Sequence, residues 1–174
     1  MVVNTEIYDY THRMSVNMIF PKTDEEIEKL MNAHSEITVQ GFEGISLDGD
    51  FGMNVREFND LIRLFTEEDI DLETVRILSR TYLIAEIAEA VKNGVITIID
   101  FDDATSGWSS ASIWDDSDKG RVLYDEGIAS FPAEVPEALE PYMDYAMLWR
   151  DSEVNMNLRV VSTDKGNYIV SLSI

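Results

Sequence analysis

The sequence predicts an α+β protein with small subdomains, in which short antiparallel sheets and helices lie around a central helical segment. Three observations carry this prediction. Short apolar or alternating stretches occur toward both ends of the 174-residue chain. Apolar residues at helical spacing fill its middle. The chain is 45% hydrophobic with only nine Gly and four Pro, so it can bury cores of its own.

The first segment, residues 1–52, is expected to form a small α+β subdomain. Thr23 and Glu26 stand at the spacing of a capping box and precede a narrow apolar stripe, which favours a helix. A glycine-rich turn at 47–52 closes the subdomain. The predicted order is strand, strand, helix, strand, at residues 6–10, 14–20, 23–33 and 37–42.

The second segment, residues 53–94, is expected to form the central helical subdomain. Asn54 marks the start of one helix, and the apolar residues that follow it fall on one face. A second, continuous helix is predicted from Asp71, an N-cap candidate, to Asn93, with Gly94 just past its end.

The third segment, residues 95–174, is expected to form another α+β subdomain. The β-branched run 95–99 predicts a strand that continues toward residue 103, and the Ser/Gly/Trp-rich stretch 104–113 predicts a loop. The remaining predictions are a short helix within 115–126, a helix from Pro136 through Tyr142 with a bent continuation to Arg150, and a hairpin formed by 158–162 and 168–172.

The net charge of −21, from 34 acidic and 13 basic residues, limits the possible partners. A nucleic-acid binder needs a basic face, and an anionic membrane surface repels such a chain, so both are excluded. Residues 23–73 carry 15 acids and three bases, and residues 100–153 carry 14 acids and three bases. These two blocks fit solvated helix faces, and they also fit two stretches of one extended anionic surface.

Catalytic and cofactor-binding patterns are few. There is no Cys, no phosphate-binding loop and no Gly-x-Ser-x-Gly element, and His12 and His34 are the two histidines. Residues 115–126 come near an EF-hand loop, but Lys119 stands where a ligand belongs. The chain start lacks the features of a signal peptide, and no apolar run approaches the roughly 20 residues of a membrane span. We therefore expect a cytoplasmic, non-enzymatic protein with no cofactor, no dedicated metal site and no membrane partner.

Imitation of DNA is one physical use of such charge. B-DNA carries one negative charge per about 1.7 Å of axis, so a dimer of this chain would match the charge of roughly 20 base pairs. Carboxylates spaced along helices could then occupy the basic groove of a DNA-binding enzyme, which they would attract over long range. A mimic of this kind needs no nucleophile, no metal and no Cys.

The most specific pattern of the chain lies in residues 118–151, where Asp118–Gly127 is followed by Glu134-Val-Pro-Glu-Ala-Leu-Glu-Pro-Tyr142, Met143-Asp-Tyr145 and Arg150-Asp151. In these residues and their spacing, the chain resembles the ArdA antirestriction family. Weaker similarity reaches the front of the chain. The sequence departs from the family at Leu148-Trp149, where Tyr-Gly is common, and at 104–114, which looks like an insertion.

The resemblance implies an elongated protein of three small subdomains that forms a homodimer and mimics bent B-form DNA. Members of this family are carried by phages and mobile elements and inhibit type I restriction–modification enzymes. The implied partner is therefore the methyltransferase and specificity core of such an enzyme, or another DNA-binding defence protein.

The second acidic block contains the candidate site residues. The carboxylates expected to face the partner are Asp100, Asp102, Asp103, Asp115, Asp116, Asp118, Asp125, Glu126, Glu134, Glu137, Glu140 and Asp144. The resemblance implies that the motif residues Val135, Pro136 and Leu139 pack the fold or form a dimer contact. Tyr142 and Tyr145 either pack in the fold or face the partner.

Two other functions remain open at the level of the sequence. One is an anti-CRISPR or other anti-defence protein that binds its target through shape rather than through duplex mimicry. The other is an acidic protein that binds divalent cations, because carboxylates are the preferred ligands of hard cations.

Overall fold

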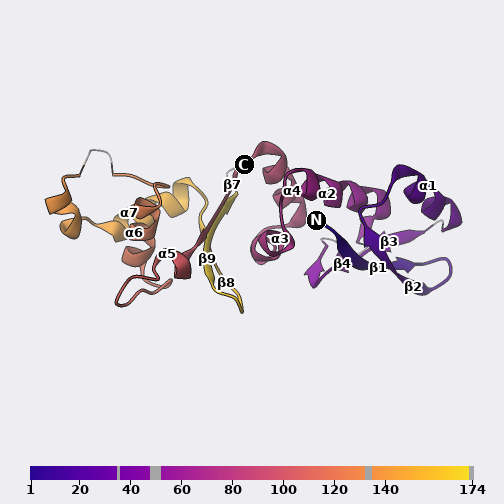
Figure 1. Ribbon diagram of the computed structural model, residues 1–174, viewed down its shortest axis with the longest axis horizontal. Helices are drawn as coiled ribbons and strands as arrows, with labels where there is room; N and C mark the ends of the chain where they lie inside the picture. The colour runs from indigo at the N-terminus through magenta and orange to yellow at the C-terminus, as the bar shows by residue number, and fades with distance from the viewer. Residues whose placement is uncertain (35, 48–51, 132–134, 173–174) are drawn as a thin grey trace. The chain divides into compact units, whose positions relative to one another are not determined.

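The computed structural model describes residues 1–34, 36–47, 52–131 and 135–172. It shows an α+β fold with short antiparallel sheets, as the sequence predicts. The chain divides into two compact units, residues 1–94 and 95–173, each with helices and strands of its own (Figure 1). The expected segments 1–52 and 53–94 both lie in the first unit.

The first unit combines strands with helices in the order expected for its N-terminal part. Its described elements are β1 (Val3–Asp9), β2 (Met14–Phe20), α1 (Asp24–Ala33), β3 (Ile37–Val39), β4 (Gly41–Phe42), β5 (Ile45–Ser46), β6 (Met53–Asn54), α2 (Val55–Glu67), α3 (Leu72–Leu78) and α4 (Ile84–Asn93). The capping box predicted at the start of α1 is present.

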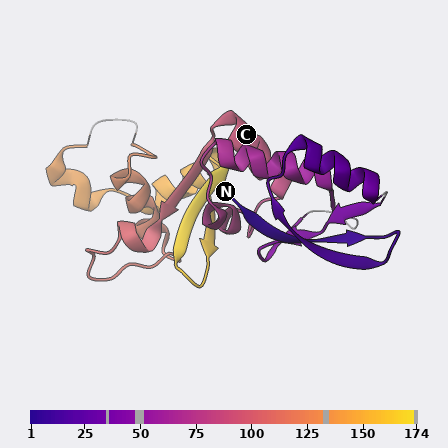
Figure 2. The same cartoon turned by 45° about the vertical axis from the view of Figure 1, so that its right-hand side comes forward.

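The sheet of the first unit has the strand order β2-β1-β3-β6, with antiparallel pairing throughout. Along β1, alternate residues are buried and the others are exposed or half-buried, so the strand turns one side to the core. Helices α1 and α2 lie over one face of the sheet (Figure 2). Phe58 of α2 meets Phe20 and Phe42 edge-on, with ring centroids 5.1 and 5.3 Å apart.

The predicted third strand is divided into β3 and β4 in the structure. The chain turns at Gln40, whose carbonyl accepts a hydrogen bond from the N–H of Leu47 at 2.9 Å. Gly41 then passes close to the facing strand, because a Cβ atom there would lie 2.6 Å from the carbonyl oxygen of Ile45. This close approach starts the β4–β5 hairpin instead of continuing β3.

The continuous helix predicted between Asp71 and Asn93 is wrong, because the structure has two helices, α3 and α4. The carbonyl of Leu78 accepts hydrogen bonds from two successive N–H groups in a tight turn, which ends α3. Glu86 then accepts the N–H of Leu83 at 2.8 Å and provides a new helix start. The predicted ends are confirmed: Asp71 is the N-cap of α3, and Gly94 closes α4 in the left-handed conformation.

The second unit begins with the strand predicted at residues 95–99 and ends with the predicted hairpin. Its described elements are β7 (Ile96–Asp100), α5 (Phe101–Ala104), α6 (Asp116–Asp125), the 3-10 helix η1 (Glu137–Tyr142), α7 (Tyr145–Asn155), β8 (Arg159–Ser162) and β9 (Asn167–Leu172). The strand order in its antiparallel sheet is β7-β9-β8.

Helices α6 and α7 lie side by side in the second unit (Figures 1 and 2). Gly120 of α6 allows this packing, since a Cβ atom at that position would stand 1.8 Å from the carbonyl oxygen of Tyr145. Trp149 of α7 is buried in the core, which also includes Phe101, Leu123 and Ile169. The core therefore joins the helices to the sheet.

Two predicted elements of the second unit are divided by a new helix start. The strand does not continue to residue 103, because Asp100 accepts the N–H of Asp103 at 3.0 Å and starts α5. The helix expected from Pro136 through Tyr142 is the 3-10 helix η1, and its expected bent continuation to Arg150 is a separate helix, because Met143 between them is extended. Asp144 then starts α7. In both places a carboxylate supplies a new helix start.

Candidate functional site

The carboxylates predicted to face a partner lie in the second unit. Eleven of the twelve fall within the described residues, and Glu134 lies outside them. None of the eleven is buried: eight are exposed, while Asp116, Asp118 and Glu140 are half-buried. Solvent access therefore does not distinguish them, and their intramolecular contacts do.

Three of these carboxylates begin helices. Asp100, Asp115 and Asp144 are the N-caps of α5, α6 and α7, and each accepts a hydrogen bond from a backbone N–H of the first turn, at 3.0, 2.8 and 2.9 Å. Unpaired N–H groups and the helix dipole both favour a negative charge at this position. These residues therefore contribute to the fold as well as to the surface charge.

Two more carboxylates hold loops in place. Asp102 accepts hydrogen bonds from the backbone and side chain of Asn167 at 3.0 and 3.1 Å, which ties α5 to the start of β9. Asp118 accepts the backbone N–H of Ser112 at 2.8 Å and fixes the loop before α6. Replacing either side chain would change local structure together with charge.

The basic residues of the second acidic block are engaged inside the unit. The Lys119 side chain is only 10% exposed; its Nζ lies 2.9 Å from Asp116 and 4.4 Å from the ring centroid of Trp149. A cation over a tryptophan ring is attracted by the ring electrons. Lys119 therefore adds little positive charge to the surface.

The other two bases of this block also have local contacts. Arg121 lies over the ring of Trp108 at 4.6 Å, and its Nε is 3.6 Å from a carboxylate oxygen of Asp125. Arg150 donates a hydrogen bond to the carbonyl of Ala146 at 3.1 Å. Both arginines remain exposed, and carboxylates dominate the surface of the block because it holds 14 acids against three bases.

Four of the predicted carboxylates carry no such structural contact. The side chains of Asp103, Glu126, Glu137 and Glu140 form no hydrogen bond or ion pair with the described residues. We call them the free carboxylates. A partner can bind these four of the predicted carboxylates without disturbing a helix start or a loop.

The motif residues differ in exposure. Val135 is half-buried and Pro136 is exposed, and no residue of η1 is buried. In η1, Leu139 is 52% and Tyr142 is 83% exposed. The structure therefore presents Leu139 and Tyr142 to a possible contact.

Tyr145 lies in an aromatic cluster at the start of α7. Its ring meets those of Tyr124 and Phe131 with centroids 5.7 and 5.8 Å apart. Burial and the negative charges of Glu140 and Asp125 raise the pKa of Tyr145 above its ordinary value of 10.0. Tyr142 and Tyr145 thus have different surroundings, one in solvent and one packed.

The stretch that comes near an EF-hand pattern forms no calcium loop. An EF-hand wraps its ligands around the ion, whereas residues 116–125 are helical. The first acid of the pattern, Asp115, accepts two backbone N–H groups of this helix. The geometry gives the divalent-cation alternative no support at this place.

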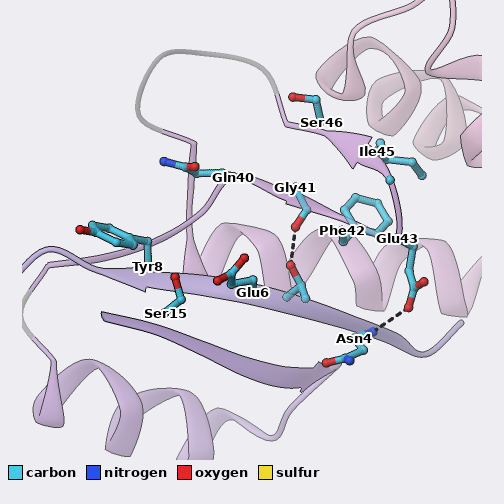
Figure 3. Close-up of a pocket in the computed structure, with 12 residues that line it drawn as sticks. Asn4, Glu6, Tyr8, Ser15, Gln40, Gly41, Phe42, Glu43, Ile45 and Ser46 are labelled. Carbon is cyan, nitrogen blue, oxygen red and sulfur yellow. Dashed lines mark hydrogen bonds between the residues drawn. The ribbon is translucent and has the colours of Figure 1, made fainter. Parts of the chain in front are cut away.

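A groove of about 560 Å³ lies beside β1 and the β4–β5 hairpin in the first unit (Figure 3). The described residues that line it include Glu6, Tyr8, Ser15 and Glu43, and none of them is His, Lys or Arg. The N–H of Asn4 donates to Glu43 at 3.2 Å. The titratable side chains of this lining are Glu6, Glu43 and Tyr8, and the carboxylate of Glu43 is already bound by Asn4.

One cluster, in which Asp9, His12 and His34 meet, does not follow from the sequence patterns. The two imidazole Nδ1 atoms lie 2.6 and 2.5 Å from the same oxygen of Asp9. The alternation of β1 contained a signal, because Val3 and Ile7 face the core and Asp9 takes the next inward position. A buried carboxylate requires a partner, but the sequence does not say which residues supply it.

Comparison of the sequence with protein-family models gave no match, and neither did comparison with curated protein sequences. In the part of the chain that the structure describes, no helix is both long enough and apolar enough to cross a membrane.

Proposed function

We propose that this chain is a non-enzymatic DNA mimic that inhibits a type I restriction–modification enzyme by occupying its DNA-binding groove. The observation that carries the proposal is the asymmetry of the second acidic block. Its 14 acids outnumber its three bases, its described carboxylates are all accessible to solvent, and one of the bases, Lys119, is nearly buried against Asp116 and Trp149. Such a surface attracts a basic groove in a salt-dependent way.

The proposed partner is the methyltransferase and specificity core of the enzyme, reached in the host cytoplasm. We propose a homodimer as the active form, because two copies carry the charge of roughly 20 base pairs of duplex. The exposed side chains of Leu139 and Tyr142 are suited to a contact with a second copy or with the enzyme.

The same exposed pair favours a second candidate, an anti-defence protein that binds its target through shape. Aromatic and aliphatic anchors at the centre of an interface supply most of the binding energy in many protein complexes. In that case Tyr142→Ala would abolish inhibition, while neutralising the free carboxylates would change it little.

Plating of unmodified phage on cells with a type I restriction system tests the proposal. The test variant is Asp103→Asn/Glu126→Gln/Glu137→Gln/Glu140→Gln. The matched control changes four exposed acids outside this block, Glu6→Gln/Glu28→Gln/Glu89→Gln/Asp164→Asn, and so removes the same amount of charge.

Expression of the chain should restore plating, and the control variant should retain this effect. With the test variant, the efficiency of plating should be at least about tenfold lower than with the unaltered chain, because the lost charges face the enzyme. No protection by the unaltered chain would refute the proposed function. Equal protection by all three forms would remove the free carboxylates from the site.

A further inference from the structure

We infer that Asp9, His12 and His34 form a binding site for a transition-metal ion, with Zn²⁺ as the best-matched ion. The three residues come from separate places in the first unit: the end of β1, the β1–β2 loop and the C-terminal end of α1. One potential ligand atom from each lies within 4.8 Å of the other two. This inference is independent of the proposed function, which rests on the second unit.

The carboxylate of Asp9 is held in position for a ligand role. Asp9 is only 2% exposed. One of its oxygens accepts the backbone N–H of His12 at 3.1 Å, which fixes the orientation of the carboxylate. The other oxygen is the one that both imidazoles approach. Metal ligands are commonly oriented by such second hydrogen bonds.

The donor set distinguishes between classes of ion. Two imidazole nitrogens and one carboxylate oxygen, with a further position for water, are typical of zinc sites that keep an open coordination position. Calcium and magnesium instead require a larger set of oxygen ligands. The cluster therefore matches a borderline-soft transition metal, in contrast to the hard cation considered for residues 115–126.

An ion can reach this cluster with small movements. The side chain of His12 is 55% exposed and that of His34 is 26% exposed. Ligand atoms around a tetrahedral zinc ion are about 3.3 Å apart, so each Nδ1 must move away from the Asp9 oxygen by less than about 1 Å. His12 lies in the loop between β1 and β2, where such a shift requires no change in the strands.

Occupation of the site would join the β1–β2 loop to the end of α1. An ion that binds only the folded state stabilises it by mass action. The net charge of the chain increases the local concentration of cations, which favours loading. The expected consequence is a first unit whose stability rises with Zn²⁺.

Zinc titration of the intact chain, stripped of metal and competed against a chromophoric chelator, tests the inference. One equivalent should bind with the highest affinity. The variants His12→Gln and His34→Gln should each lower that affinity at least about tenfold. The matched control for charge is Glu6→Gln, which removes an exposed carboxylate from the same strand and should leave the affinity unchanged.

Binding of Co²⁺ provides a second readout that a purely structural role of the histidines would not produce. The unaltered chain should show visible absorption bands of cobalt with nitrogen ligands, and both histidine variants should lose them while circular dichroism confirms that they are folded. The inference is overturned by the absence of a stoichiometric Zn²⁺ equivalent, or by equal affinity in the unaltered chain and both histidine variants.

Discussion

Acidic side chains perform two different tasks at the scale of single residues. Glu26 illustrates the structural task, because its carboxylate accepts hydrogen bonds from the backbone and the hydroxyl of Thr23 at 2.9 and 2.8 Å. Asp103 and the other free carboxylates have no such contact among the described residues. The count of acids in the sequence does not separate these groups; the hydrogen bonds do.

Titration of Glu26 follows from its contacts. The backbone and side-chain hydrogen bonds of Thr23 hold the pKa of Glu26 below its ordinary value of 4.5. The stabilisation by this interaction is therefore complete above pH 4.5 and is lost as the pH falls through the lowered pKa of the folded state. Thr23→Ala removes the hydroxyl but keeps the backbone N–H, so it should raise the pKa of Glu26 part of the way toward 4.5, as measured by NMR titration of its side chain. An unchanged pKa in that variant would contradict a contribution from the hydroxyl.

Gly120 gives a second prediction at this scale. A methyl group there would collide with the carbonyl of Tyr145, which belongs to the backbone and cannot turn away. Gly120→Ala should lower the free energy of unfolding by at least about 1–3 kcal/mol, measured by urea denaturation. Gly107→Ala is the matched control, because nothing lies within 4 Å of its added Cβ. Equal stability of the two variants would show that α6 and α7 do not approach as described.

At the scale of elements, helix starts explain where sequence prediction succeeded and failed. Thr23 and Asp71 were recognised as caps because each precedes an apolar pattern of helical period. Asp100 and Asp144 were missed because each stands inside a pattern that favours continuation, a β-branched run in one case and a helical stretch in the other. A short-range hydrogen bond overrode the pattern at both places.

The two candidate sites also differ in whether the local sequence predicts them. Local sequence predicts the candidate carboxylates, since charge is a property of neighbouring residues, and the motif residues follow from the resemblance alone. The contact between Asp9 and His34 depends on how α1 packs against the sheet, and no local pattern contains that information. The role of Asp102 likewise depends on β9, which is distant in sequence.

Asp144 permits a test that separates its structural task from its charge. Asp144→Ala removes the N-cap of α7 and should lower the free energy of unfolding by about 1 kcal/mol. Asp144→Ser removes the charge but retains an oxygen acceptor, so it should lower the free energy of unfolding less. Thermal and urea denaturation of both variants measure the difference. If the serine variant is as unstable as the alanine variant, the hydrogen bond to Met147 is not what makes Asp144 important.

At the scale of the whole molecule, the net charge of −21 opposes folding through self-repulsion. The burial of apolar residues in the two cores must offset this loss of stability. Lys119 is nearly buried against Trp149, which leaves Arg121 and Arg150 as the exposed bases among the described residues of the second acidic block. The arrangement is consistent with the proposed imitation of DNA.

Competition with DNA tests the central claim most directly. A labelled duplex carrying the recognition sequence is bound to the purified methyltransferase core of a type I enzyme, and the chain is titrated in while fluorescence anisotropy is recorded. Mimicry predicts complete displacement of the duplex and an inhibition constant that rises at least about tenfold between 50 and 200 mM salt. A complex that contains enzyme, duplex and chain together, with an affinity independent of salt, would contradict it.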